Sequence, residues 1–151
     1  MERAIHTHLA ERLCSRQWRD FLAALAGELA DDLTTSHLRG LLRRTGERFA
    51  RQRALPGMTT VAELQAAVNA IWTDLDWGWL QIAEAGDHLA LTHYCAPLAA
   101  GFGAGSQAWT TAFLEGVYEQ WMRQLGANQQ LRVTQAGEPD AFGTVGFRFG
   151  K

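Results

Sequence analysis

Two carboxylates in the second half of the chain have the spacing of a catalytic pair. Glu115 and Glu119 stand four residues apart in a segment with helical periodicity, so they share one helix face. Paired carboxylates perform acid–base chemistry in glycosidases, but there they usually face each other across a cleft from separate elements. Arg123 follows Glu119 by one further turn and offers an ion pair. We therefore expect structural ion pairs and no catalytic residue here.

Metal ligands could come from a predicted strand. His93 and Cys95 share one face of that strand, while His88 points to the other face. Cys14 and Cys95 are the only cysteines and have no companion at metal-site or redox-motif spacing, so we predict two free thiols. His6 and His8, near the N-terminus, form an equally weak pair. No metal site and no cofactor are predicted.

Two segments could bind anions. The glycine-rich stretch 101–105 precedes a helix but lacks the Lys-Ser/Thr of a phosphate-binding loop, so it is predicted to be a flexible linker. A predicted helix around residues 38–51 carries a basic face that could hold phosphates or an acidic partner, or could simply be solvated. That face consists of Arg39, Arg43, Arg44, Arg48 and Arg51.

The chain holds six tryptophans, and aromatic rings pack well against the apolar faces of sugars. Trp77 and Trp79 fall on one face of a predicted strand and are the better surface candidates. The spacing of the other four, Trp18, Trp72, Trp109 and Trp121, is that of core or interface residues. Because no nucleophile, base and oxyanion donor come together, the residues indicate a non-catalytic domain that self-associates.

Length and charge restrict the class of protein. At 151 residues and 47% hydrophobic, the chain is long enough for one domain with its own core. The net charge of −2 argues against nucleic-acid binding. Residues 54–122 contain seven acids and no Lys or Arg, so opposite charges could pair within one chain or between chains. The apolar run 21–27 suits neither a membrane span nor a secretory signal, which predicts a cytoplasmic protein without direct membrane insertion.

The elements that position these residues follow from periodicity. Thr60 and Glu63 form a capping box that begins a helix, and that helix leads into a strand over 77–84. A turn at Ala85-Gly86 returns the chain as a second strand over 88–94. A long helix beginning near Ser106 and ending at Gly126 follows, and then a second hairpin around residues 131–134 and 145–149.

The N-terminal third is predicted to be helical. Residues 1–14 form an arm with a weak apolar stripe, and residues 15–151 form a single domain. A clear helical stripe comprises Trp18, Phe21, Leu22, Leu25, Leu29 and Leu33. The order is helices first, then hairpin, helix and hairpin. This order predicts an α+β fold with helices packed on an antiparallel sheet of about four strands.

Several of these segments resemble the bacterial cellulose synthase operon protein D family, whose members are the D subunits of the synthase. NAIWTDLDWGW (69–79) and LEGVYEQW (114–121) carry most of the resemblance. FLAALAGEL (21–29), RRTGERFA (43–50) and the pair Val133-Thr134 follow in the matching order. Asp76 and Trp79 stand where Asn and Tyr are expected, and the similarity covers roughly residues 18–135.

The resemblance implies an accessory subunit of the cellulose synthase complex without glycosyltransferase activity. Family members resemble a cylinder of dimers assembled into an octamer, whose N-terminal arms line passages for β-1,4-glucan chains, so that the chains crystallise into ordered fibrils. Candidate passage residues are Arg3, His6, His8 and Arg12. Candidate oligomer or structural interface residues are Trp77, Trp79, Trp109, Phe113, Tyr118 and Trp121.

The expected partners are identical copies, other cellulose synthase subunits or a scaffold protein. We expect a position near the inner membrane on its cytoplasmic side, with the periplasm as the alternative. A different class, a small-molecule-binding or sensor domain of similar architecture, stays open on fold analogy.

Overall fold

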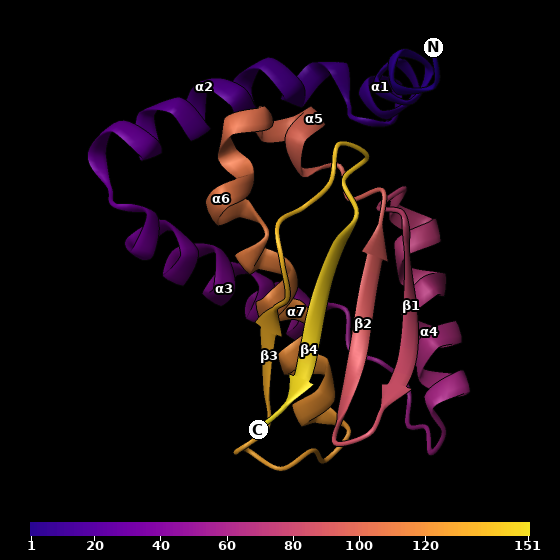
Figure 1. Cartoon of the computed structure of the whole chain (residues 1–151). Helices are drawn as coiled ribbons and strands as arrows, with labels where there is room; N and C mark the ends of the chain where they lie inside the picture. The colour runs from indigo at the N-terminus through magenta and orange to yellow at the C-terminus, as the bar shows by residue number, and fades with distance from the viewer.

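Helices cover one face of a four-stranded antiparallel sheet and leave the other face open (Figure 1). The computed structural model describes residues 1–151 and confirms the predicted α+β class. The helices are α1 (Glu2–Leu13), α2 (Arg16–Asp32), α3 (Thr35–Gln52), α4 (Val61–Leu75), α5 (Leu98–Phe102), α6 (Gln107–Thr110) and α7 (Ala112–Gln124), with a 3-10 turn, η1 (Ala104–Ser106), before α6. The strands are β1 (Trp79–Ala85), β2 (His88–Tyr94), β3 (Arg132–Gln135) and β4 (Val145–Gly150).

The strand order is β1-β2-β4-β3, and all neighbours are antiparallel. Both predicted hairpins are confirmed, as β1–β2 and β3–β4. The pairing of β2 with β4 joins them into one sheet. Its register aligns Leu91 with Phe147 and His93 with Val145. Because strand side chains alternate between faces, these residues all point into the core beneath the helices.

The predicted start of α4 is confirmed. The Thr60 hydroxyl accepts a hydrogen bond from the Glu63 N–H at 3.1 Å. The Glu63 carboxylate accepts from the N–H of Thr59 at 3.0 Å, one residue before the N–H that a standard capping box uses. Two N–H groups at the helix start are thereby satisfied.

The predicted start of the first strand is wrong by two residues. Asp76 ends α4 with φ of 56°, and Gly78 follows with φ of 78°, so the chain turns before β1 begins. A Cβ on Gly78 would lie 1.9 Å from the Tyr94 carbonyl oxygen, which leaves room only for glycine. This turn separates Trp77 from the strand: Trp77 packs on the core while Trp79 points outward, so they do not share a face.

The predicted flexible linker and long helix are also corrected. Residues 98–106 form α5 and η1, and the helix expected from Ser106 onward is divided into α6 and α7. Ser106 occupies the N-cap position of α6, but its hydroxyl donates to the Gly103 carbonyl and makes no capping hydrogen bond. Apolar packing of this Ala-rich segment outweighs its glycine content, because Leu98 and Gly101 are buried.

The centre of the core is the crossing of α3 and α7. Every residue of α7 from Ala112 to Glu119 is buried. A Cβ on Gly46 would lie 2.0 Å from the Phe113 carbonyl oxygen, and one on Gly116 would lie 2.0 Å from that of Arg43. The two glycines therefore allow the helix backbones to touch.

Candidate functional site

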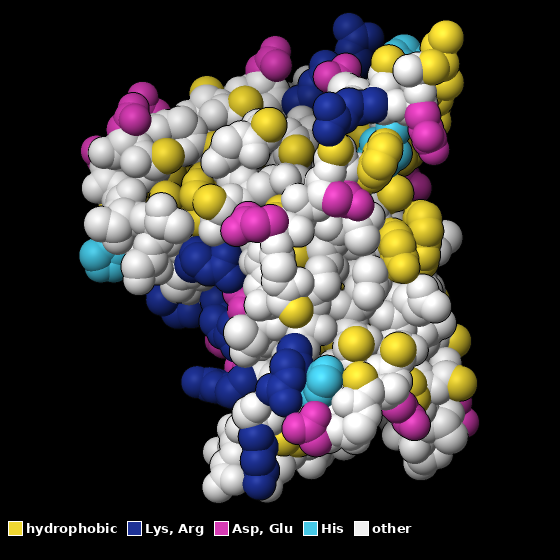
Figure 2. Space-filling model, in the orientation of Figure 1, with side chains coloured by type: hydrophobic (Ala, Val, Ile, Leu, Met, Phe, Trp, Pro, Cys, Tyr) yellow, Lys and Arg dark blue, Asp and Glu magenta, His cyan; other side chains and the backbone are white.

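Large exposed apolar side chains concentrate at the N-terminal end of the molecule. Figure 2 shows yellow atoms along α1 and α2, and Figure 1 shows these helices projecting beyond the sheet. Of nine such side chains in the chain, eight precede residue 34: Met1, Ile5, Leu9, Leu13, Trp18, Phe21, Leu25 and Leu33. The N-terminal helices are therefore the part of the protein least covered by its own core.

The apolar stripe of α2 is split between two surroundings. Ala26 is buried and Leu29 packs against the core cluster. Trp18 and Phe21 point outward, 55% and 56% exposed, with ring centroids 5.8 Å apart in an edge contact. One part of this stripe is therefore covered by the chain, and the part around Trp18 and Phe21 is left open. We call the outward surface formed by Trp18, Phe21 and Leu25 the α2 apolar face.

The C-terminal end of α2 carries negative charge. Glu28, Asp31 and Asp32 lie in or near its last turn, which contains no basic residue. Negative charge at a helix C-terminus is unfavourable, because the backbone carbonyls there already carry partial negative charge. All three side chains are exposed. A positively charged partner at this end would relieve the repulsion.

The arm residues are not all on one side of α1. His6 turns toward the body, where its ring contacts Phe142 at a centroid distance of 4.8 Å and its Nε2 lies 3.7 Å from the Cys95 sulfur. Arg3, His8 and Arg12 are exposed. At 100° per residue, His8 and Arg12 share a side of the helix and Arg3 lies nearly opposite.

A hollow of about 200 Å³ lies between α1 and the end of the sheet. It is mainly apolar, with Leu9 and Leu13 on the arm side and Pro97 and Phe142 on the body side. Burial, and secondarily the Asp140 carboxylate, raise the pKa of the Cys95 thiol at its wall. The thiol therefore stays protonated, which is the less reactive form. Both cysteines are free, as predicted.

The predicted ion pairs of α7 are confirmed and extended. Glu119 contacts Arg43 at 2.7 Å, Arg123 at 3.0 Å and Arg132 at 3.3 Å. Glu115 pairs with Arg39 and, at 3.5 Å, with Arg43. The structure thus resolves the question of charge pairing for these two acids, because their partners lie in the same chain.

The same carboxylates close one edge of the sheet. Glu119 accepts from the Val133 N–H at 3.0 Å, and Glu115 accepts from the Gln135 N–H at 3.1 Å. Both N–H groups belong to the outer edge of β3. With cations and edge amides occupying their oxygens, neither carboxylate is free to act as an acid or base. Their role is structural.

The basic face of α3 divides into two parts. Arg39 and Arg43 turn toward α7 and are about 30% exposed or less. Arg44, Arg48 and Arg51 are exposed to solvent. The three exposed arginines fit the alternative of a solvated helix face. They also remain available to an acidic partner.

A buried polar chain links the sheet to two helices. The His93 Nε2–H donates to the Trp77 carbonyl at 2.7 Å, since that oxygen can only accept. His93 Nδ1 therefore accepts from the Tyr118 hydroxyl at 2.5 Å, and that hydroxyl accepts from Trp72 Nε1–H at 3.0 Å. Desolvation lowers the pKa of His93 to about 4 and raises that of Tyr118. His93 is therefore neutral at pH 7 and structural.

Reasoning from the sequence did not find this series of hydrogen bonds, because its residues are up to 46 positions apart. The three side chains considered as metal ligands, His88, His93 and Cys95, do not come together. His93 is engaged in the buried chain, His88 contacts Asp87 at 2.9 Å, and Cys95 follows the end of β2.

The predicted interface aromatics have two different positions. Trp109, Phe113, Tyr118 and Trp121 are buried within this single chain, in its core cluster. Trp77 is half-buried against the same cluster. Only Trp79 offers a large surface, 48% exposed, and it stacks on Tyr94 with ring centroids 5.1 Å apart.

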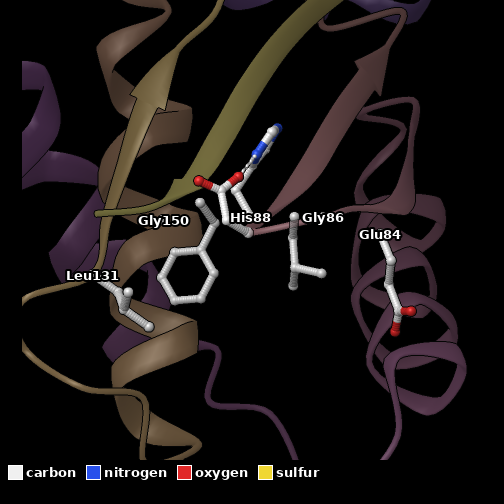
Figure 3. Close-up of a pocket in the computed structure, with 8 residues that line it drawn as sticks. Glu84, Gly86, His88, Leu131 and Gly150 are labelled. Atoms are coloured by element: carbon white, nitrogen blue, oxygen red, sulfur yellow. Dashed lines mark hydrogen bonds and ion pairs between the residues drawn. The ribbon is translucent and has the colours of Figure 1, made fainter.

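A second hollow, of about 280 Å³, lies at the β1–β2 turn (Figure 3). His88 and Leu131 approach it from different elements, and Glu84 points away from them. Asp87 interacts with His88 and, at 3.5 Å, with Arg148. The titratable groups do not converge on one point, so the hollow lacks the arrangement of a catalytic centre.

None of the helices is long and apolar enough to cross a bilayer.

Comparison with known proteins shows the family of this chain. The family described as the D subunit of cellulose synthase matches residues 4–148. A "Cellulose synthase operon protein D" of Komagataeibacter xylinus is 28% identical over 128 residues, which cover 83% of this chain and 82% of the relative. Another from the same organism is 30% identical over 118 residues, 76% of each chain. A third, from Komagataeibacter sucrofermentans, is 28% identical over 104 residues, 68% of this chain and 67% of the relative. With 145 of its 151 residues inside the family match, the chain belongs to the family of cellulose synthase D subunits.

Proposed function

We propose that this protein is a non-catalytic accessory subunit of a bacterial cellulose synthase complex, and that the α2 apolar face joins identical copies. Family membership supports a role in cellulose synthesis and favours it over the small-molecule sensor. The observation that carries the self-association is the exposure of Trp18 and Phe21, each more than half open to solvent.

Burial of these rings would contribute to the free energy of association. Full burial of one large apolar side chain contributes roughly 1.5–3 kcal/mol. Tryptophan is also among the residues that most often dominate the energy of protein interfaces. Large contiguous apolar patches on a protein surface mark interaction sites.

Charge complementarity favours a second copy as the partner. The acidic end of α2 (Glu28, Asp31, Asp32) has no basic side chain paired with it. The exposed arginines of α3 (Arg44, Arg48, Arg51) likewise have no carboxylate partner, unlike Arg39 and Arg43. Contact between the acidic end of one copy and the arginines of another would satisfy both.

Both edges of the sheet are closed, which directs association to the helices. On the β1 edge, the Asn69 side chain accepts from the Leu80 N–H at 2.6 Å and donates to the Leu80 carbonyl at 2.9 Å. Gln65 accepts from the Ile82 N–H at 2.7 Å. Glu115 and Glu119 occupy the β3 edge as described above. Strand addition is therefore disfavoured on either side.

In this proposal the copies form dimers and then a closed octameric ring. The arms project into its interior, where His8 and Arg12 on one side of α1, or Arg3 on the opposite side, meet the glucan chains. The ring organises chain extrusion or the array of synthases, so that the chains emerge close enough to crystallise. We place it on the cytoplasmic side of the inner membrane, in contact with other synthase subunits or a scaffold protein.

The test is the mass of the purified assembly by native mass spectrometry and light scattering. The double substitution Trp18→Ser and Phe21→Ser is expected to reduce the closed oligomer to dimers or monomers. Trp79→Ser removes a comparably exposed tryptophan outside the α2 apolar face and is the matched control, which should keep the parent mass. A parent protein that is monomeric at micromolar concentration, or a double variant of unchanged mass, would overturn the proposal.

A further inference from the structure

The open face of the sheet carries an aromatic pair at one end. Trp79 and Tyr94 are directly opposite in the β1–β2 register, and their rings stack with an interplanar angle of 16°. The Tyr94 hydroxyl donates to the Gln81 side-chain oxygen at 3.2 Å, which fixes the tyrosine ring. Since Tyr94 covers one side of the indole and nearly half of the indole remains exposed, the other side is available to a ligand.

The sheet surface that continues from this pair toward the β1–β2 turn is polar but uncharged up to Arg148. Gln81 faces Thr92 across the strands, and Thr92 faces Gly146 on β4. The next row consists of Ala83 and Ala90, and the first charge on this face, Arg148, comes opposite Ala90. Figure 2 shows this region as mainly white atoms, below a yellow patch over the upper ends of β1 and β2.

We propose that Trp79, Tyr94, Gln81 and Thr92 form a binding site for a neutral β-linked glucose chain. The axial C–H bonds give such a sugar an apolar face that stacks on the indole, and its equatorial hydroxyls project sideways as donors and acceptors. Gln81 and Thr92 are placed to meet those hydroxyls. The absence of charge on the rows of the sheet that continue from the rings matches a neutral ligand and provides no cation there for a phosphate or an acidic peptide.

The site is continuous with the arm. Cys95 follows Tyr94 directly and contacts His6 of α1. The aromatic pair therefore lies near the place where the arm packs on the body of the protein. A glucan guided past α1 would reach Trp79 next. This inference rests on the proposed function, because it supplies the contact through which the protein would hold a chain.

The experiment measures binding of cellohexaose to the assembled protein by isothermal titration calorimetry. The parent is expected to bind, and Trp79→Ala should weaken binding at least about tenfold, since an aromatic stacking contact is lost. Gln129→Ala, at an exposed loop position outside both the aromatic pair and the α2 apolar face, should keep the parent affinity. Maltohexaose, with α linkages and a curved chain, should bind at least about tenfold more weakly.

A second variant protects the test against misfolding. Gln81→Ala removes a hydrogen-bonding group from an exposed strand position and should weaken cellohexaose binding while circular dichroism stays unchanged. Absence of binding by the parent, or equal affinity of parent and Trp79→Ala, would overturn the site. Since Trp79 lies outside the α2 apolar face, the assembly mass would be unaffected in either case, so failure of this site is distinguishable from failure of the proposed assembly.

Discussion

Acid should destabilise this protein through a single buried histidine. His93 is fully buried, and desolvation lowers its pKa from 6.5 to about 4. The unfolded chain therefore binds a proton at this site between pH 6.5 and 4, while the folded chain does not. The contribution of His93 to stability is complete above pH 6.5 and is lost as the pH falls toward 4.

The magnitude follows from the shift. A difference of about 2.5 pKa units, at 1.36 kcal/mol each, corresponds to about 3 kcal/mol of unfolding free energy. The hydrogen bonds explain why the folded state resists the proton. Protonated His93 would point a second donor at the Tyr118 hydroxyl, which already accepts from Trp72, and would leave the hydroxyl hydrogen without its acceptor.

The assay is urea unfolding followed by circular dichroism at several pH values from 7.5 to 4.5. Protein concentration is kept constant, because association also contributes to apparent stability. The comparison is with His93→Gln, whose amide can still donate to the Trp77 carbonyl and accept from Tyr118 but does not titrate. Carboxylates contribute the same background in both proteins.

We expect His93→Gln to be less stable than the parent at pH 7.5 and to lose less stability on acidification. The difference in pH dependence should reach about 2.5 kcal/mol between pH 7.5 and 4.5 and about 3 kcal/mol below pH 4. Parallel curves for parent and variant, or a His93 ring that titrates near 6.5 by NMR, would refute the reasoning.

Two further predictions concern packing and the sheet edge. Gly116→Ala places a Cβ 2.0 Å from the Arg43 carbonyl oxygen, so it should destabilise the fold by at least about 3 kcal/mol in urea unfolding or prevent folding. The control is Gly27→Ala, whose Cβ has nothing within 4 Å. It should be neutral or stabilise α2 by about 0.5–1 kcal/mol. A Gly116→Ala protein of parental stability would contradict the close crossing. Asn69→Ala should cost roughly 1–3 kcal/mol, because it leaves both backbone groups of Leu80 without partners, and an unchanged urea midpoint would show that water replaces the amide.

Local signals in the sequence were sufficient for most elements. The Thr60 cap, the strand over 88–94 and the second hairpin depend on neighbours a few residues away, and the structure confirms them. Trp77 was misplaced because its position depends on the close approach of Gly78 to Tyr94, which lies on another strand. The segment 98–106 was misjudged because its helices are held by contacts with the core.

The candidate site was only partly predictable. The stripe on α2 was visible as a 3.6-residue period, but a period does not tell which side of a helix the rest of the chain will cover. Similarly, Trp109, Phe113, Tyr118 and Trp121 have the composition of an interface, and the fold places them inside one protomer. The exposed pair of Trp79 and Tyr94 depends on strand register, which pairs residues 15 positions apart.

The sequence by itself determined the class of fold and the principal helices and strands, because propensity, capping and apolar periodicity act over a few residues. Its short motifs, in their order along the chain, also indicated the family by resemblance. Only the tertiary structure decided which aromatic rings are buried, which carboxylates close a sheet edge and which tryptophans face solvent. Those outcomes depend on pairings such as Arg43 with Glu119 and Trp72 with Tyr118, whose partners are 76 and 46 residues apart. Contacts at that separation form only when the whole chain has folded.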